Sequence, residues 1–180
     1  VTASGNISAS NNVSAKYILA KIPCISLGIH AAVSNGGAQE IDIYTATPVN
    51  IPWGKLYFKD DTWFTHDIST NPEQITMVEA GRYEITMTVA FNSDTTRANP
   101  YIELIANGST FLYCVCSNGY LRRSGDNNST MNGDWVVELA AGDVITAKSM
   151  YKAAWGASPG ASHNTAMHLH YTRITIKKIG

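Results

Sequence analysis

Hydrophobic and polar residues alternate with a period of two along much of the chain, and the clearest case lies within residues 81–93. Large apolar side chains occupy five alternate positions there, and small or polar side chains fill the positions between them. A period of two places all five side chains on one face of a β-strand, so this face is predicted to lie in a core. The five residues are Tyr83, Ile85, Met87, Val89 and Phe91.

The opposite face of this predicted strand carries Glu84, Thr86 and Thr88. Uncharged threonines suit a second contact surface as well as they suit water. A shorter apolar strand over residues 75–78 comes just before a turn in which Gly81 can adopt the positive φ of a tight turn.

Similar short runs recur at near-regular spacing, and turn signals separate them. Asn107-Gly108 is the strongest hairpin signal in the chain. Residues 117–133 are polar and contain three glycines, and a long loop is predicted there. The remaining predicted strands cover residues 21–33, 41–44, 51–58, 101–106, 110–116, 135–139, 144–147 and 168–179.

Roughly ten short strands without a convincing helix predict an all-β sandwich or jelly roll. In the last of these strands, the alternation requires a slip near Thr172-Arg173. The pattern alone does not separate a jelly roll from an immunoglobulin-like sandwich.

Two motifs resemble the C1q/TNF-type jelly-roll family. In residues 79–83, EAGRY, a glycine precedes the aromatic residue that opens a long core strand, with Glu79 where the family often has proline. Residues 139–144, LAAGDV, resemble the L-x-x-G-D-x-V turn of the same family. The sequences of residues 65–67, THD, and 97–100, RANP, most resemble those of C1q-like domains in bacteriophage virion proteins.

The resemblance implies a C1q/TNF-like jelly-roll domain over residues 23–180, preceded by a short extended stalk or arm over residues 1–22. It also implies a homotrimer. In this family the C-terminal strand lies in the middle of the inner sheet, so Ile174 and Ile176 are expected in the core.

The first residues of the chain contain a short internal repeat. Residues 6–9, NISA, recur as residues 12–15, NVSA, with one apolar residue in each copy. Three chains wound together, or a turn of a β-solenoid, can bury such a residue, as in the shafts of phage fibres. A flexible linker is the alternative.

The amino-acid composition limits the classes of molecule that this protein is expected to bind. Charged residues make up 15% of the 180 residues, against roughly 25% in an average soluble domain. The net charge is −1, which gives no electrostatic attraction to nucleic acid or to an anionic membrane. No run approaches the roughly 20 apolar residues of a membrane span, so membrane insertion is not expected.

Aromatic residues in or near predicted loops are the best candidates for ligand binding. Tryptophan and tyrosine close to arginine suit stacking on a saccharide or a protein contact, although packing in the core or between subunits is the alternative for each. The candidate ligand-binding residues are Trp63, Tyr120, Arg122, Arg123, Tyr151 and Trp155.

Two histidines, His168 and His170, share one face of the last predicted strand. Near a three-fold axis they would meet their copies, and with Tyr171 they are the candidate trimer-interface residues. They suit metal binding or a response to pH, or alternatively a hydrogen-bonded contact between strands or subunits. His30, on the first strand, would lie near them if the family's strand order holds.

Catalytic and cofactor motifs are missing from the sequence. It contains no Gly-x-Ser-x-Gly turn and no glycine-rich phosphate loop, so an enzyme is not expected, and neither is a cofactor. Asp60, Asp61 and Asp67 have oxygen ligands for calcium but match no fixed motif, so solvated loop carboxylates and no metal site are expected. The three cysteines are interpreted as free thiols.

Three functions follow from these observations. The first is a non-enzymatic phage virion protein, a homotrimeric fibre tip on the virion surface that binds a host glycan or protein. The second is a capsid decoration protein or head fibre, whose residues 1–22 bind other virion proteins. The third is a carbohydrate-active fibre domain, for which no spacing of acidic residues selects a catalytic pair.

Overall fold

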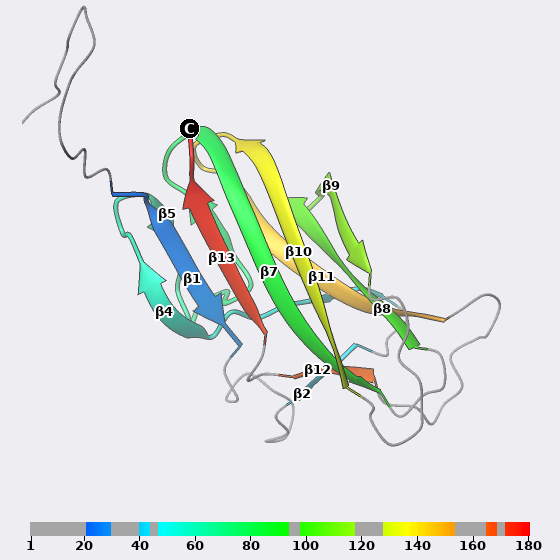
Figure 1. The fold of residues 1–180 in the computed structure, drawn as a ribbon. Helices are drawn as coiled ribbons and strands as arrows, with labels where there is room; N and C mark the ends of the chain where they lie inside the picture. The colour runs from blue at the N-terminus through cyan, green and yellow to red at the C-terminus, as the bar shows by residue number, and fades with distance from the viewer. Residues whose placement is uncertain are drawn as a thin grey trace, which may run out of the picture.

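The computed structural model describes residues 21–29, 40–43, 47–93, 98–117, 128–153, 165–168 and 172–180. Every regular element in these ranges is a β-strand, and the strands form two antiparallel sheets (Figure 1). The prediction of an all-β sandwich is therefore confirmed. None of these ranges holds a helix long and apolar enough to cross a membrane.

The larger sheet has seven strands. Its longest strand is β7 (Gly81–Ser93), which pairs along one edge with β10 (Asn128–Leu139) and along the other with β12 (Thr165–His168) and β13 (Arg173–Lys178). The sheet continues from β13 through β1 (Cys24–Gly28) to β4 (Lys55–Lys59), and β2 (Glu40–Asp42) pairs with β12. This order places β4 and β10 at opposite edges of one sheet (Figure 1).

The smaller sheet has six strands. Its central strand, β11 (Val144–Ala153), pairs with β8 (Ala98–Ala106) on one edge, and with β6 (Ile75–Met77) and β3 (Val49–Asn50) on the other. Outside these lie β5 (Phe64–Thr65), which pairs with β6, and β9 (Thr110–Ser117), which pairs with β8. Asn107 and Gly108 connect β8 to β9 with φ angles of 52° and 76°, which confirms the predicted hairpin.

The core lies between the two sheets, and the alternating face of β7 lies at its centre. All five predicted core residues of β7 are at most 1% exposed. Phe64 of the smaller sheet meets Tyr83 edge to face, with ring centroids 6.1 Å apart, and burial raises the pKa of Tyr83. Ile174 and Ile176 are also buried, and β13 lies between β7 and β1, as the family resemblance implied.

Both sequence motifs lie where the chain crosses from one sheet to the other. The turn before Gly81 carries the chain from β6 to β7, and the turn at Gly142 carries it from β10 to β11. The two crossings are bonded to each other, because Gly142 N–H donates to the Met77 carbonyl and Met77 N–H donates to the Asp143 carbonyl. The apolar strands around each motif therefore belong to different sheets.

The side chain of Asp143 holds this junction in place. Its carboxylate accepts hydrogen bonds from the Ala140 N–H at 2.8 Å and from the Asn107 side-chain amide at 2.9 Å. The Asn107 side-chain oxygen in turn accepts the N–H of Val144 at 3.0 Å. One aspartate thus ties the β8–β9 hairpin to the crossing between the sheets.

Several predicted boundaries were wrong. Residues 21–23 precede β1, β8 already begins at Ala98, and β11 continues to Ala153. Residues 128–133 belong to β10 and not to the long loop, because they pair with the far half of β7. Residues 165–167 come before the last predicted strand but belong to β12, whereas β13 begins at Arg173, next to the predicted slip. The two strands pair with different stretches of β7. Residues 51–54 precede β4 and are not part of it, and Pro52 lies within them.

Gly81 allows the start of β7 to lie very close to the backbone of Gly180 and the side chain of Lys178. Arg82 N–H donates to the Gly180 carbonyl, and Ile179 N–H donates to the Arg82 carbonyl, both at 2.8 Å. A Cβ atom on residue 81 would overlap the carbonyl oxygen of Gly180 and the side chain of Lys178.

Gly81→Ala is expected to destabilise the fold by roughly 2–4 kcal/mol, because it combines overpacking with an unfavourable backbone angle. Gly142→Ala serves as the matched control, because Gly142 has φ 87° but open space around it. Its expected cost is only about 1–2 kcal/mol. Urea unfolding of both variants measures the difference, and equal costs would contradict the close-approach argument.

Asp143→Ala removes both side-chain bonds at the junction and is expected to cost about 2 kcal/mol. Asp143→Asn keeps one acceptor oxygen and should recover part of that loss. Thermal unfolding at neutral pH measures both variants. An Asp143→Ala protein as stable as wild type would show that the crossing does not depend on this side chain.

Candidate functional site

The face of the larger sheet that points away from the core, here called the open face, carries the main candidate site. It consists of every second residue of β10, β7, β13 and β1, together with Tyr57 and Phe58 of β4. Because the intervening residues are buried in the core, the alternation along each strand fixes which side chains this face presents.

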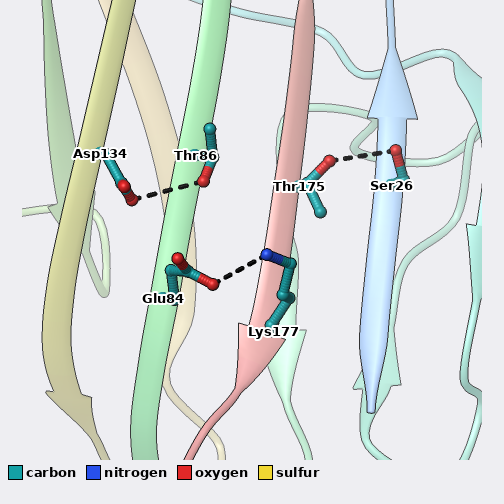
Figure 2. Close-up of polar contacts among 6 residues, drawn as sticks. All are labelled: Ser26, Glu84, Thr86, Asp134, Thr175 and Lys177. Atoms are coloured by element: carbon teal, nitrogen blue, oxygen red, sulfur yellow. Dashed lines mark hydrogen bonds and ion pairs between the residues drawn. The ribbon is translucent and has the colours of Figure 1, made fainter. Parts of the chain in front are cut away.

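Polar side chains on the open face are paired across neighbouring strands. In each case the two residues are direct partners in the strand register, so the pairing follows from the same alignment that buries the core. Figure 2 shows three of these pairs in a row, from β10 to β1. The five pairs are Arg82–Glu138, Thr86–Asp134, Thr88–Asn132, Glu84–Lys177 and Ser26–Thr175.

The Glu84–Lys177 pair lies near the middle of this face. Lys177 Nζ donates to a Glu84 carboxylate oxygen at 2.9 Å, and both side chains are partly exposed. The hydrogen bond from Lys177 to Glu84 raises the pKa of that lysine above its ordinary value. Partly exposed pairs of this kind contribute at most about 1 kcal/mol, so their main effect is to hold the face in one arrangement.

One edge of the open face is basic and aromatic. Tyr57, on β4, is half-exposed, and both Lys55 Nζ and Arg173 Cζ lie over its ring, 5.0 Å and 4.6 Å from the centroid. The ring covers Gly28, where any larger side chain would overlap it. Phe58 is 45% exposed beside it. We call Lys55, Tyr57, Phe58 and Arg173 the aromatic edge.

The opposite edge is acidic and also exposes an apolar side chain. Along β10, Asp134 and Glu138 flank Val136, which at 60% is the most exposed of the large apolar side chains in the described ranges. Glu138 pairs with Arg82, and Asp134 accepts a hydrogen bond from Thr86 but forms no salt bridge with any described residue. We call Asp134, Val136 and Glu138 the acidic edge.

Of the six candidate ligand-binding residues, one is described with both its backbone and its side chain. Trp63 is half-buried and packs against the core, and Lys178 Nζ lies 4.4 Å from the centroid of its ring. Tyr151 belongs to β11, but its side chain lies outside the described part of the structure. Tyr120, Arg122, Arg123 and Trp155 lie outside the described residues and stay predictions.

The candidate trimer-interface residues are described only in part. His168 ends β12, with its backbone opposite Glu40, and its side chain is not described. His170 and Tyr171 lie outside the described residues, as does His30. Their assignment to a subunit interface stays a prediction.

The three loop carboxylates considered as calcium ligands have other partners. Asp60 pairs with Lys21 at 2.7 Å, and Asp61 pairs with Lys59 at 2.9 Å. Asp67 accepts hydrogen bonds from the backbone N–H groups of Ser69 and Thr70, which lower its pKa. Within the described ranges, no three His, Cys, Asp or Glu side chains are grouped in a way that could hold a metal ion.

Neither edge of the open face was predicted from the sequence. A signal for the aromatic edge was present, because Leu56, Tyr57 and Phe58 are consecutive large apolar residues that break the alternation of a half-buried strand. All three are 41–45% exposed on an edge strand. The acidic edge had no local signal beyond Val136, whose neighbours belong to an ordinary alternating strand.

Comparison with known proteins gave matches at the level of structure alone. No protein-family model matches the chain, and no curated protein matches it in sequence. Murine APRIL at pH 8.0 superimposes with a TM-score of 0.57 at 14% identity, covering 88% of this chain and all of that chain. The Eiger TNF of S. frugiperda superimposes with a TM-score of 0.54 at 9% identity, covering 88% of this chain and 93% of that chain.

These similarities concern the fold, since both identities are far below the level that indicates shared function. The chain therefore has an all-β jelly-roll fold of the TNF-like type.

Proposed function

We propose that this chain is a non-enzymatic structural protein of a bacteriophage virion. In this proposal it forms the homotrimeric tip of a fibre on the virion surface and binds a glycan or protein of the host cell. The phage assignment rests on the sequence resemblance. The assembly rests on one structural observation, which is that the two edges of the open face are complementary.

The complementarity concerns both charge and apolar surface. The aromatic edge carries Lys55 and Arg173, neither of which forms a salt bridge with a described residue, beside two exposed aromatic rings. The acidic edge carries Asp134 and Glu138 around an exposed valine. The aromatic edge supplies positive charge, the acidic edge supplies negative charge, and both expose apolar side chains. The aromatic edge of one copy therefore suits the acidic edge of a second copy.

The positions of the edges allow head-to-tail contacts between copies. Because β4 and β10 lie at opposite edges of the same sheet, each copy can use one edge to bind the copy before it and the other edge to bind the copy after it. Such head-to-tail contacts form a ring if the rotation between copies closes, and three copies close it in this proposal. The paired polar side chains between the edges would then face the other subunits.

The remaining parts of the proposal concern residues that lie mostly outside the described ranges, or whose side chains are not described. Residues 1–22 are the stalk that joins the tip to other virion proteins. Tyr120, Arg122, Arg123, Tyr151 and Trp155 are the ligand-binding residues. Three copies presented together would convert weak single contacts into firm attachment.

The assembly is tested by reversing charges on each edge. Arg173→Glu and Asp134→Arg are each expected to weaken self-association by roughly tenfold or more, about 1.4 kcal/mol, because each places like charges at the contact. The double variant in one chain restores opposite charges and should recover much of the association. Light scattering over a dilution series measures the mass of each protein.

Glu103→Arg is the matched control, because it makes the same change of charge on β8 of the smaller sheet, which contains neither edge. This variant should keep the wild-type mass. A monomeric wild type would overturn the assembly altogether. A trimer that survives both single reversals would place the subunit contact elsewhere on the molecule.

Adhesion is tested on a glycan array with the assembled protein. Replacing Arg122 and Arg123 together by alanine is expected to lower binding at least tenfold, about 1.4 kcal/mol, if these residues contact the ligand. Hydrolysis of a bound glycan by the wild-type protein would contradict the non-enzymatic assignment.

A further inference from the structure

His66, which follows β5, has an unusual pair of hydrogen-bond partners. Its side chain is buried, with 7% of the residue exposed. Nδ1 lies 2.8 Å from the backbone carbonyl oxygen of Gln74, and Nε2 lies 2.8 Å from the backbone carbonyl oxygen of Trp53. Both partners are carbonyl oxygens, which accept hydrogen bonds and never donate them.

This geometry selects a protonation state. A neutral imidazole carries hydrogen on only one of its two nitrogens, so it can donate to only one of these carbonyls. The other nitrogen would then direct a lone pair at a carbonyl oxygen 2.8 Å away, which is repulsive in a buried site. Both contacts are hydrogen bonds only when both nitrogens carry hydrogen, that is, in the imidazolium form.

The charged groups around His66 are few. Lys59 Nζ, on β4, donates to the backbone carbonyl of His66 at 3.2 Å and also pairs with Asp61. Asp67 is adjacent in sequence, and the hydrogen bonds from Ser69 and Thr70 that lower its pKa keep it ionised beside the ring. Glu73 adjoins Gln74 on the third segment around the ring.

The two carbonyls belong to segments that are otherwise far apart in sequence. Trp53 is fully buried and lies just before β4, while Gln74 lies just before β6. A backbone bond from Trp53 N–H to the Pro72 carbonyl at 2.8 Å joins the same two segments. The indole N–H of Trp53 has no hydrogen-bond partner among the described residues, so within them the site contains one unsatisfied polar group.

We propose that His66 is a proton-dependent latch that joins the segment before β4 to the segment before β6. With hydrogen on both nitrogens, the ring bonds to both carbonyls and holds the segments together. When the ring loses one proton, one of the two contacts becomes repulsive, and the segments separate more readily.

The direction of the pH dependence follows from proton linkage. In the folded state the doubly protonated ring donates to two carbonyls and the singly protonated ring donates to one, so folding favours the protonated form. The contribution of His66 to stability is therefore present in mild acid and is lost as the pH rises. For one proton, the folded-to-unfolded ratio changes by at most about tenfold per pH unit.

Two measurements test the latch. In the wild-type protein, ¹⁵N NMR at pH 6.5 is expected to show hydrogen on both ring nitrogens of His66, identified by the signals that His66→Gln removes. The second measurement is urea unfolding of wild type and His66→Gln at pH 5.5 and 8.5, at one protein concentration. The wild type should lose at least tenfold in its folded-to-unfolded ratio relative to the variant between these two values.

The variant isolates this residue, because glutamine has about the right reach, donates to only one carbonyl and does not titrate. The other four histidines are common to both proteins, so their effects cancel in the comparison. A ring nitrogen without hydrogen at pH 6.5 would overturn the latch, and so would parallel pH profiles for the two proteins. If His66→Gln does not fold, sequential assignment of the wild-type spectrum identifies the His66 ring signals, and the NMR measurement then tests the latch without the variant.

Discussion

The register of β7 against its neighbours is the constraint on which the rest of this structure depends. One face of β7 is fully buried, so a shift of one residue would move five large apolar side chains out of the core and their polar neighbours into it. That cost fixes the alignment of β10 and β13 on either side. The same alignment then sets Thr86 opposite Asp134, and Glu84 opposite Lys177 (Figure 2). The pattern on the open face is thus a consequence of the pattern in the core.

The interior of the open face and its two edges differ in how well they can bind another molecule. In its interior, the polar side chains form hydrogen bonds and salt bridges with one another. They fix the shape of this region but contribute little to the binding of another molecule. At its two edges, exposed aromatic and aliphatic side chains lie beside charged groups. Lys55, Arg173 and Asp134 form no salt bridge with a described residue, whereas Glu138 pairs with Arg82. Apolar surface beside charged groups is typical of contact sites between proteins, where the charges select the partner and the apolar groups supply the affinity. The TNF-like fold alone does not specify which molecule binds there.

Much of the fold could be predicted from the sequence because the information is local. The period of two identified the core face of β7, and Asn107-Gly108 identified the hairpin, since each depends on a few adjacent residues. The length of β10 could not be predicted, because its first half is polar and becomes a strand only by pairing with β7. The environment of His66 could not be predicted either, because its partners are backbone carbonyls 13 and 8 residues away, supplied by loops without any regular pattern.

The central position of β13 has a consequence for the order in which the protein folds during synthesis. In the larger sheet, β1 and β4 form one ribbon and β7 and β10 form another, and β13 is the strand that joins them. Since β13 is made from residues 173–178, both ribbons leave the ribosome long before the strand that unites them. Until then, each ribbon has an unpaired edge and an apolar face without its full cover. During this time, the unpaired strand edges can pair with those of other nascent copies translated from the same messenger RNA. The chain must either avoid such pairing or use it to begin assembly with those copies.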